Sequence, residues 1–227
     1  MLILGHRGAP SIKPENTLAS FEAALAHNVD GIELDIQLTS DGQIIVYHDF
    51  EILDTNNTAH LISSLSLNEI QSVSPTLKIP TLQDVCEMFP RAKIFNIEIK
   101  SQALDNTDII QKTLSLIEKY NFIDNVIVSS FNPFVLLNIK KKAPNIKRGL
   151  LWTGNNSEGW FVTHSTYSQI KPYSFHANIE YLDSNLAQWA LQHDLQIFVY
   201  TVNTKPDLEK AYKLNVHGIF TDFPTLI

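Results

Sequence analysis

The chain has 227 residues, of which 44% are hydrophobic and 18% are charged, a composition typical of a globular protein with a full core. Its formal net charge of -7 argues against nucleic acids or anionic membranes as partners, and no apolar run approaches the ~20 residues of a membrane span. The single cysteine, Cys86, excludes an internal disulfide bond, and residues 1–4 are too short for a signal peptide. We therefore expect a cytoplasmic protein without stable membrane insertion.

Apolar runs typical of buried strands alternate along the chain with the spacing of amphipathic helices. Pro10 and Pro14 keep the segment after the first run irregular, and Asn16 and Thr17 can cap a helix that reaches Ala26. The strand candidates are residues 2–4, 31–38, 94–99, 126–130, 148–151, 174–177, 196–202 and 218–221. The helix candidates are residues 17–26, 82–89, 108–120, 133–142, 184–193 and 206–214, and the pattern around 160–169 is less clear.

The stretch 31–49 carries acidic residues inside an apolar strand pattern. Glu33 and Asp35 alternate with aliphatic residues and therefore share one face of the strand. Ser-Asp-Gly at residues 40–42 indicates a tight hairpin, and an ordinary two-residue turn would return His48 opposite Asp35 to within about one residue. For this stretch alone, a solvated face of an antiparallel pair is the alternative interpretation.

The order of the elements favours one architecture. Near-continuous apolar strands that alternate with helices indicate a parallel sheet. Eight such units in 227 residues favour a closed (β/α)₈ TIM barrel over an open doubly wound sheet. We predict an α/β protein with one domain over residues 1–227, in which a β-hairpin and a polar, weakly patterned segment at about 50–80 follow the second strand.

Acidic side chains collect at the expected C-terminal ends of the strands, where such barrels hold their active sites. Glu33, Asp35 and Glu98 would meet there, and unpaired carboxylates raise one another's pKa. A divalent cation removes the repulsion, and all-oxygen ligands favour Mg²⁺ or Ca²⁺ over zinc. The alternative is a structural ion-pair network in which Arg7 and Lys100 neutralise the acids.

Two histidines belong to the same region. His6 ends the first strand and His48 ends the hairpin, so both can act as general acid or base near neutral pH. Arg7 and Lys100 add positive charge, and this combination suits the transfer of a phosphoryl group. His176 also ends a strand and is a weaker candidate for the mouth, whereas the other histidines fall at helix ends or in loops.

Six short motifs, taken in order, resemble the glycerophosphodiester phosphodiesterase family. They are Gly5-His6-Arg7-Gly8, Pro14-Glu15-Asn16-Thr17, Glu33-Leu34-Asp35, His48-Asp49, Glu98-Ile99-Lys100 and Thr221-Asp222-Phe223-Pro224. Each motif alone is weak, but the ordered set spans almost the whole chain and is highly specific. The resemblance implies a TIM barrel that hydrolyses glycerophosphodiesters to sn-glycerol 3-phosphate and an alcohol, as part of glycerol and lipid metabolism.

The resemblance also implies roles for individual residues. Glu33, Asp35 and Glu98 would bind Mg²⁺ or Ca²⁺, and His6 and His48 would form the acid/base pair. Arg7 and Lys100 would hold phosphate, and the segment 50–80 would be the family's insertion over the active site. The full set expected to contact or support the small-molecule substrate is Arg7, Lys100, Glu15, Phe131, His176 and Tyr200.

The chain departs from the family pattern at two places, and both concern the alcohol rather than the reaction. The family commonly shows Leu-Asp-Arg-Thr where this chain has Leu53-Asp54-Thr55-Asn56, and Tyr200 replaces the usual tryptophan. One alternative is a lysophospholipase D, whose groove for an acyl chain would be lined by aromatic residues. The candidates for that lining are Phe131, Trp152, Trp160 and Phe161. A non-catalytic phosphate-binding barrel is the other alternative, but it would need a broken constellation.

No serine, threonine or cysteine lies where a base could activate it, so the substrate is expected to supply the nucleophile. The resemblance implies attack by the glycerol 2-hydroxyl and a cyclic glycerol phosphate. Direct attack by a metal-bound hydroxide is the alternative that the sequence leaves open.

Overall fold

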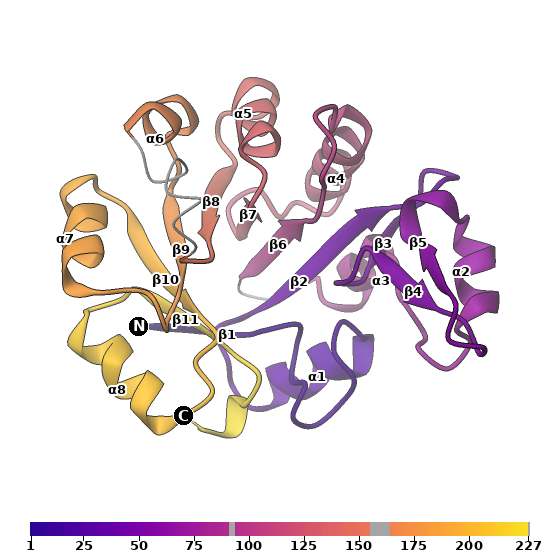
Figure 1. The fold of residues 1–227 in the computed structure, drawn as a ribbon, viewed down its shortest axis with the longest axis horizontal. Coiled ribbons are helices and arrows are strands. Elements are labelled where there is room, and N and C mark those ends of the chain that lie inside the picture. The colour runs from indigo at the N-terminus through magenta and orange to yellow at the C-terminus, as the bar shows by residue number, and fades with distance from the viewer. Residues whose placement is uncertain (91–93, 155–163, 227) are drawn as a thin grey trace.

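The structure is a computed structural model of residues 1–227, and it describes all of them except 91–93, 155–163 and 227. Within the described residues, eight parallel strands close into a barrel with helices on the outside (Figure 1). Strand β1 pairs with both β2 and β11, which closes the sheet and confirms the predicted TIM barrel. The barrel strands are β1 (Leu2–Gly5), β2 (Gly31–Leu38), β6 (Phe95–Ile99), β7 (Val126–Ser130), β8 (Lys147–Trp152), β9 (Ser174–Asn178), β10 (Gln196–Tyr200) and β11 (Gly218–Thr221).

The outer helices begin where the sequence supplies capping side chains. Thr17 caps the first of them by accepting a hydrogen bond from the Ser20 amide, and Thr81 and Thr204 each form a capping box with an aspartate three residues later. The helices are α1 (Leu18–Ala26), α3 (Leu82–Met88), α4 (Thr107–Lys119), α5 (Pro133–Lys142), α6 (His164–Ile170), α7 (Ser184–Gln192) and α8 (Lys205–Lys213). None of the helices in the described residues is long and apolar enough to cross a membrane.

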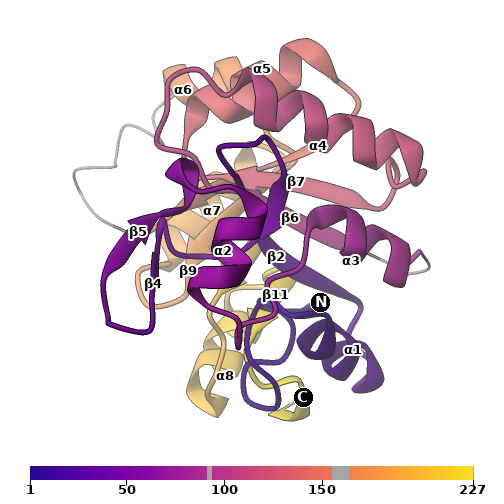
Figure 2. The same cartoon turned by 90° about the vertical axis from the view of Figure 1, so that its right-hand side faces the viewer.

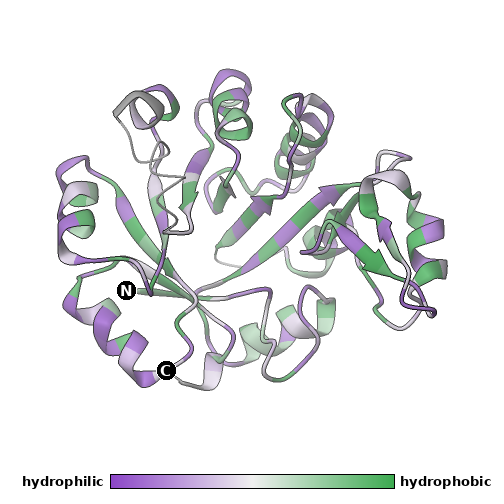
Figure 3. Ribbon diagram, in the orientation of Figure 1, coloured by the Kyte–Doolittle hydropathy of each residue, from purple (hydrophilic) through white to green (hydrophobic). Residues whose placement is uncertain are grey.

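Alternate residues of β2 face opposite sides of the barrel wall, as the banded colouring of this strand in Figure 3 illustrates. Ile32, Leu34 and Ile36 are fully buried in the apolar layer beneath the helices. Glu33 and Asp35 are only 4% and 1% exposed, so the interpretation of a solvated strand face is wrong. Both acids belong instead to the barrel interior, above an apolar cluster formed by Leu4, Ile127, Phe198 and Phe220.

The hairpin after β2 differs by one residue from the prediction. Strand β3 (Ile44–Val46) runs antiparallel to β2 with Ile36 opposite Val46, and residues 40–42 form the loop. The predicted two-residue turn is therefore wrong, because Gly42 adopts a left-handed φ of 76° and makes room for a third loop residue. The Tyr47 amide donates to the Asp35 carbonyl, so His48 still lies within one residue of the predicted register.

The segment between β3 and α3 forms a small unit beside the barrel (Figure 2). It contains β4 (Glu51–Leu53), β5 (Ala59–Leu61), the short 3₁₀ helix η1 (Ile62–Ser64) and α2 (Leu67–Val73). The sequence of this segment predicts only a short helix at 65–73, because strands of three residues carry too little periodicity to detect. The small unit beside the barrel has its own apolar cluster, which consists of Ile45, Ile52, Ile62, Ile70 and Ile79.

Candidate active site

Three buried carboxylates meet at the C-terminal end of the barrel. Glu33 and Asp35 come from β2, and Glu98 comes from β6, where the strand register places it opposite Asp35. One carboxylate oxygen from each residue lies within 4.8 Å of the others, and the residues are at most 9% exposed. The predicted cluster of acids is therefore present in the described part of the chain.

The negative charge of the three acids is only partly neutralised in this arrangement. Burial and the charges of Asp35 and Glu98 raise the pKa of Glu33 well above its ordinary value, and burial beside Asp35 raises the pKa of Glu98 to about 7. Lys100 Nζ lies 3.4 Å from Glu98 Oε1, yet that oxygen has no hydrogen-bond partner among the described residues. Clustered carboxylate oxygens with unmet charge fit a hard divalent cation such as Mg²⁺ or Ca²⁺.

The loop between β1 and α1 holds two of these acids in place. The Arg7 amide donates to Glu33 Oε2 over 2.8 Å. The Asn16 side chain donates to Asp35 Oδ2 over 2.9 Å and accepts from the Asp35 amide over 3.3 Å. Both loop residues have left-handed backbone angles, with φ of 51° at Arg7 and 55° at Asn16. Sequence reasoning assigned Asn16 only to helix capping, although its place in Pro-Glu-Asn-Thr was a usable signal.

A carboxylate anchors the ring of His6. Asp222, which follows β11, approaches His6 Nδ1 to 2.7 Å, and the Asp222 amide in turn donates to Asn203 Oδ1. Burial acts to raise the pKa of Asp222. The hydrogen bonds that its carboxylate accepts from His6 and Asn203 outweigh this effect, so the pKa is lower than the ordinary value. Asp222 therefore stays ionised beside the imidazole. The sequence placed it at a strand end without assigning it this role.

His48 is held in a similar way from the hairpin side. Asp49 Oδ1 lies 2.7 Å from His48 Nδ1, and Lys100 Nζ lies 3.0 Å from His48 Nε2. Because an ammonium group only donates, His48 Nε2 accepts this bond and Nδ1–H donates to Asp49. In both histidines Nδ1 makes the contact with an aspartate, and at His48 Nε2 accepts from Lys100.

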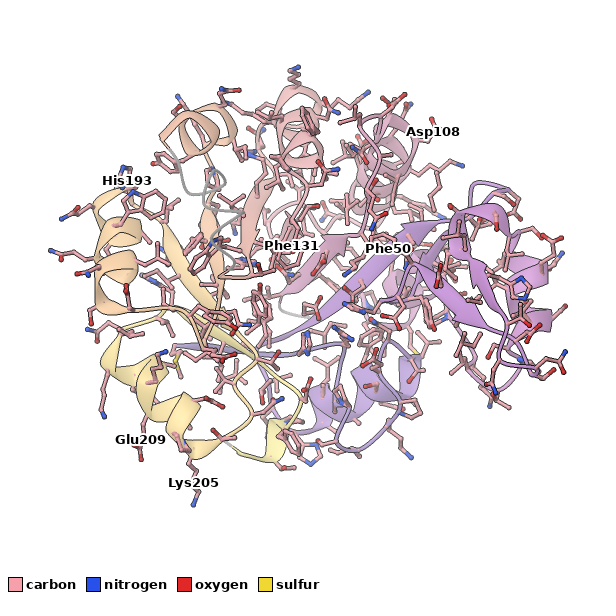
Figure 4. All side chains as sticks on the ribbon, viewed as in Figure 1. Phe50, Asp108, Phe131, His193, Lys205 and Glu209 are labelled. Carbon is pink, nitrogen blue, oxygen red and sulfur yellow. The ribbon has the colours of Figure 1, made fainter. Side chains whose placement is uncertain are left out.

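The two histidines line one cavity of about 270 Å³ together with Arg7, Glu33 and Glu98. Phe131, His176 and Tyr200, the predicted substrate contacts, also line this cavity, and Figure 4 labels Phe131 near the centre of the barrel. The structure adds Asn96, a buried residue of β6 that the sequence did not single out.

The remaining predicted side chains lie around this cavity. Glu15 pairs with Arg7 Nη1 at 2.9 Å and supports it from outside, while Lys100 bridges His48 and Glu98. Trp152 packs on Phe175, and Trp160 and Phe161 lie outside the described residues. Of the other histidines, His193 lies at the outer edge of the molecule in Figure 4, where it packs against aromatic rings.

Known proteins resemble this chain over almost its whole length. The model of the glycerophosphoryl diester phosphodiesterase family matches residues 6–226. A glycerophosphodiester phosphodiesterase of Caldanaerobacter subterraneus is 36% identical over 237 residues, which cover 100% of this chain and 96% of that protein.

Solved structures show the same fold. A glycerophosphodiester phosphodiesterase of Thermotoga maritima superposes with a TM-score of 0.82 at 26% identity, covering 100% of this chain and 96% of that one. A phosphodiesterase of Oleispira antarctica, solved in complex with the product sn-glycerol-3-phosphate, has a TM-score of 0.84 at 23% identity, covering 99% and 94% of the two chains. The chain therefore belongs to the glycerophosphoryl diester phosphodiesterase family.

Proposed function

We propose that the protein hydrolyses glycerophosphodiesters to sn-glycerol 3-phosphate and an alcohol, with a divalent cation and an acid/base pair of histidines. The observation that carries this proposal is the shared cavity, in which His6 and His48 lie with Arg7 and two of the three buried acids. A cation site, a phosphate-binding guanidinium and two imidazoles are groups that can catalyse the cleavage of a phosphodiester.

Glu33, Asp35 and Glu98 would hold the cation. When bound, Mg²⁺ or Ca²⁺ supplies positive charge that neutralises the phosphodiester and favours ionisation of a nearby hydroxyl group. Arg7 and Lys100 contribute further N–H donors for phosphate oxygens, since each lies at one side of the acid cluster. Removal of metal with a chelator should abolish turnover, and addition of Mg²⁺ or Ca²⁺ should restore it.

The histidines move the protons. His48 Nε2 carries no proton in this arrangement, because Lys100 donates to it. When Lys100 donates to a phosphate oxygen instead, this lone pair becomes available, which favours His48 as the base that takes the proton of the attacking hydroxyl. His6, with Asp222 behind it, would then protonate the leaving alcohol. General acid–base catalysis typically contributes ~10²–10⁴-fold, so either alanine variant should lose about that much activity on natural substrates.

A leaving group that needs no proton separates the two roles. We expect His6→Ala to recover activity on glycerophospho-p-nitrophenol, because nitrophenolate departs without an acid, whereas His48→Ala should stay slow on both substrates. Recovery of His48→Ala alone would reverse the assignment. If both variants kept the wild-type rate on glycerophosphocholine, the acid/base pair would be wrong.

The glycerol 2-hydroxyl serves as the nucleophile in this proposal: it displaces the alcohol and forms a cyclic glycerol phosphate, which a water molecule then opens to sn-glycerol 3-phosphate. The described side chains around the cavity offer no serine or cysteine nucleophile beside His6 or His48, and intramolecular attack exploits effective molarities of ~10⁵–10⁸ M. A 2-deoxy analogue should therefore bind but turn over far more slowly than its parent. Equal rates for the two would favour direct attack by water instead.

A lysophospholipase D is the second candidate. The observation in its favour is a second, larger groove of about 590 Å³ that begins at Lys100 and is lined in part by Leu38, Phe50 and Leu61. A human lysophospholipase D is 25% identical over 265 residues, which cover 98% of this chain and 83% of that protein. Direct comparison of glycerophosphocholine with 1-acyl lysophosphatidylcholine separates the two functions.

We further propose a cytoplasmic role in glycerol and lipid metabolism. A single buried cysteine and a net charge of -7 support it, since neither a disulfide framework nor attraction to anionic membranes is indicated. Cell fractionation with antibody detection tests the location.

A further inference from the structure

Four buried polar atoms of residues that line the catalytic cavity have no hydrogen-bond partner among the described residues, and two of them belong neither to the acid cluster nor to Arg7. These two are Oδ1 of Asn96 and Nδ1 of His176, and the two residues are 2% and 0% exposed. Both side chains line the 270 Å³ cavity that also contains His6 and His48. A buried polar group without a partner costs free energy, so this pair indicates that an ordered water or a ligand in the cavity completes it.

The pair forms the floor of the cavity. Asn96 precedes Glu98 by two residues on β6 and faces the same side one layer deeper in the barrel. The ring of His176 packs on Phe198 and Phe220, at centroid distances of 5.2 and 5.3 Å, which are members of the apolar cluster that fills the barrel below.

Gly149 of β8 makes room for this floor. A Cβ atom on Gly149 would lie 2.6 Å from His176 Cε1 and 3.0 Å from Ser129 Cβ, so only glycine leaves space for both. Ser129 Oγ in turn accepts a hydrogen bond from Asn96 Nδ2 over 2.9 Å. Ser129 and His176 therefore both lie against Gly149, and Asn96 is joined to them through Ser129.

The hydrogen-bonding pattern of this surface suits a hydroxyl group. Burial lowers the pKa of His176 to about 3, so the ring is neutral and has one N–H. Ser174 Oγ lies 2.8 Å from Nε2 and can donate to it, which leaves the proton on Nδ1. An Nδ1–H donor and an Oδ1 acceptor then meet the needs of a hydroxyl, which accepts one hydrogen bond and donates another.

We propose that Asn96 and His176 bind the terminal hydroxyl of the glycerol unit and thereby select substrates in which that hydroxyl is free. This inference rests on the proposed function, because the acids and histidines above the floor position the phosphodiester. A lysophospholipid that carries an acyl ester at this oxygen has no proton to donate to Asn96. Its chain would also meet the packed rings of Phe198 and Phe220. The floor therefore favours glycerophosphodiesters over 1-acyl lysophospholipids.

The test compares substrate and enzyme changes together. We expect the wild-type protein to turn over glycerophosphocholine with a kcat/KM roughly 10–100-fold above that of its 1-deoxy analogue, because the analogue leaves two buried groups unpaired. His176→Phe, which fits beside Phe198 and Phe220, should lower kcat/KM for the parent and bring it close to that of the analogue. Asn96→Ala should narrow the ratio in the same way.

A binding measurement without turnover complements the kinetics. In calorimetry, sn-glycerol 3-phosphate should bind the wild-type protein more tightly than its 1-deoxy analogue, and the difference should shrink in both variants. Thr113→Val is a matched control, because Thr113 is buried in α4 and donates only to the Ile109 carbonyl, away from the cavity. Thr113→Val should leave the preference for the parent compound over its 1-deoxy analogue unchanged.

Several outcomes overturn the inference. Equal wild-type rates on the parent and the 1-deoxy analogue would show that the floor holds water rather than substrate. An equal loss on both substrates in the variants would show a structural role. Wild-type turnover of 1-acyl lysophosphatidylcholine as fast as glycerophosphocholine would exclude the proposed selection. If His176→Phe fails to fold, the inference is tested by Asn96→Ala and by the wild-type ratio of kcat/KM for glycerophosphocholine and its 1-deoxy analogue. If no glycerophosphodiester were hydrolysed at all, the proposed function itself would fail.

Discussion

The two ends of the barrel each hold an arginine, but they satisfy its charge differently. At the N-terminal ends of the strands, Arg148 donates to the backbone carbonyls of Pro144, Ile146 and Lys171 at 2.7–3.0 Å. At the mouth, Arg7 Nη1 lies 2.9 Å from Glu15 Oε1, and Nε lies 3.3 Å from Asp35 Oδ2. One guanidinium binds neutral carbonyls, whereas the other lies among carboxylates.

The pKa values follow this difference. Burial alone lowers the pKa of Arg148. Burial also acts to lower the pKa of Arg7, but the charges of Asp35, Glu15 and Glu33 outweigh it and raise the pKa. Arg148 ties the loop before β8 to the loop before β9 and uses four of its five N–H donors on backbone carbonyls. The charges at the mouth remain incompletely balanced, and that imbalance is what a cation and a phosphate group can use.

The largest effect is expected from a mouth residue that contacts neither metal nor phosphate. Asp222→Asn should reduce kcat by about 10²–10⁴-fold, because an amide no longer fixes the tautomer and orientation of His6. The melting temperature should change little. Steady-state kinetics and thermal denaturation of the same sample check this. A large loss of stability with a normal kcat would instead show that Asp222, like Arg148, stabilises the fold and does not support the reaction.

Removal of the mouth guanidinium comes next. Arg7→Met should lower kcat/KM by about 10²–10³-fold at saturating Mg²⁺, the typical cost of losing a donor that stabilises developing negative charge. Calorimetry should also show weaker binding of sn-glycerol 3-phosphate. Arg7→Lys keeps the charge without the planar donor group, so its kcat/KM should lie between those of the wild-type protein and Arg7→Met. Unchanged product binding in Arg7→Met would remove Arg7 from the phosphate site.

The matched change at the other end should reverse the pattern. Arg148→Met leaves buried carbonyls without a donor and should lower the free energy of unfolding by about 1–3 kcal/mol. For a chain of this size, each kcal/mol corresponds to roughly 2–4 °C in melting temperature. Activity at 25 °C should stay at the wild-type level. A loss of activity comparable with that of Arg7→Met would break the distinction between the two ends.

The smallest effect concerns pH. The pKa of Glu98 rises from 4.5 to about 7 on folding without metal, so between these values the folded state binds more protons than the unfolded state. The contribution of Glu98 to stability in chelator is therefore fully present below about pH 4.5 and is lost as the pH rises to about 7. Added Mg²⁺ should raise the melting temperature more at pH 8 than at pH 5. Glu98→Gln should flatten this pH dependence, and a wild-type protein that is equally stabilised by Mg²⁺ at both pH values would contradict it.

Sequence reasoning predicted the barrel because its signals are local. Apolar runs such as 126–130 and capping residues such as Thr81 determine their own elements, and the alternation of strands with helices leaves few topologies. Strands β4 and β5 were missed for the opposite reason. Each has three residues, and they are held by pairing with one another and by packing in the cluster around Ile52.

The site divides along the same line. The meeting of Glu33, Asp35 and Glu98 could be predicted for two reasons. Side chains alternate along a strand, and barrels of this kind hold their active sites at the C-terminal ends of the strands. Asn96 and Asn203 could not be predicted, since each acquires its place only through a partner far along the chain, Ser129 and Asp222 respectively. Asp222 was visible in a motif, but its contact with His6 spans 216 positions and depends on closure of the barrel.

That closure has a consequence for synthesis on the ribosome. Strand β1 is made first, yet it finds one of its two neighbours only when β11 emerges. Until then the barrel has an open seam, and His6 lacks the carboxylate that orients it. A nascent chain that stops before residue 218 therefore has neither a sealed wall nor a complete acid/base pair. If the acid/base pair acts as proposed, enzymatic activity during translation would therefore report the moment at which the last strand joins the first.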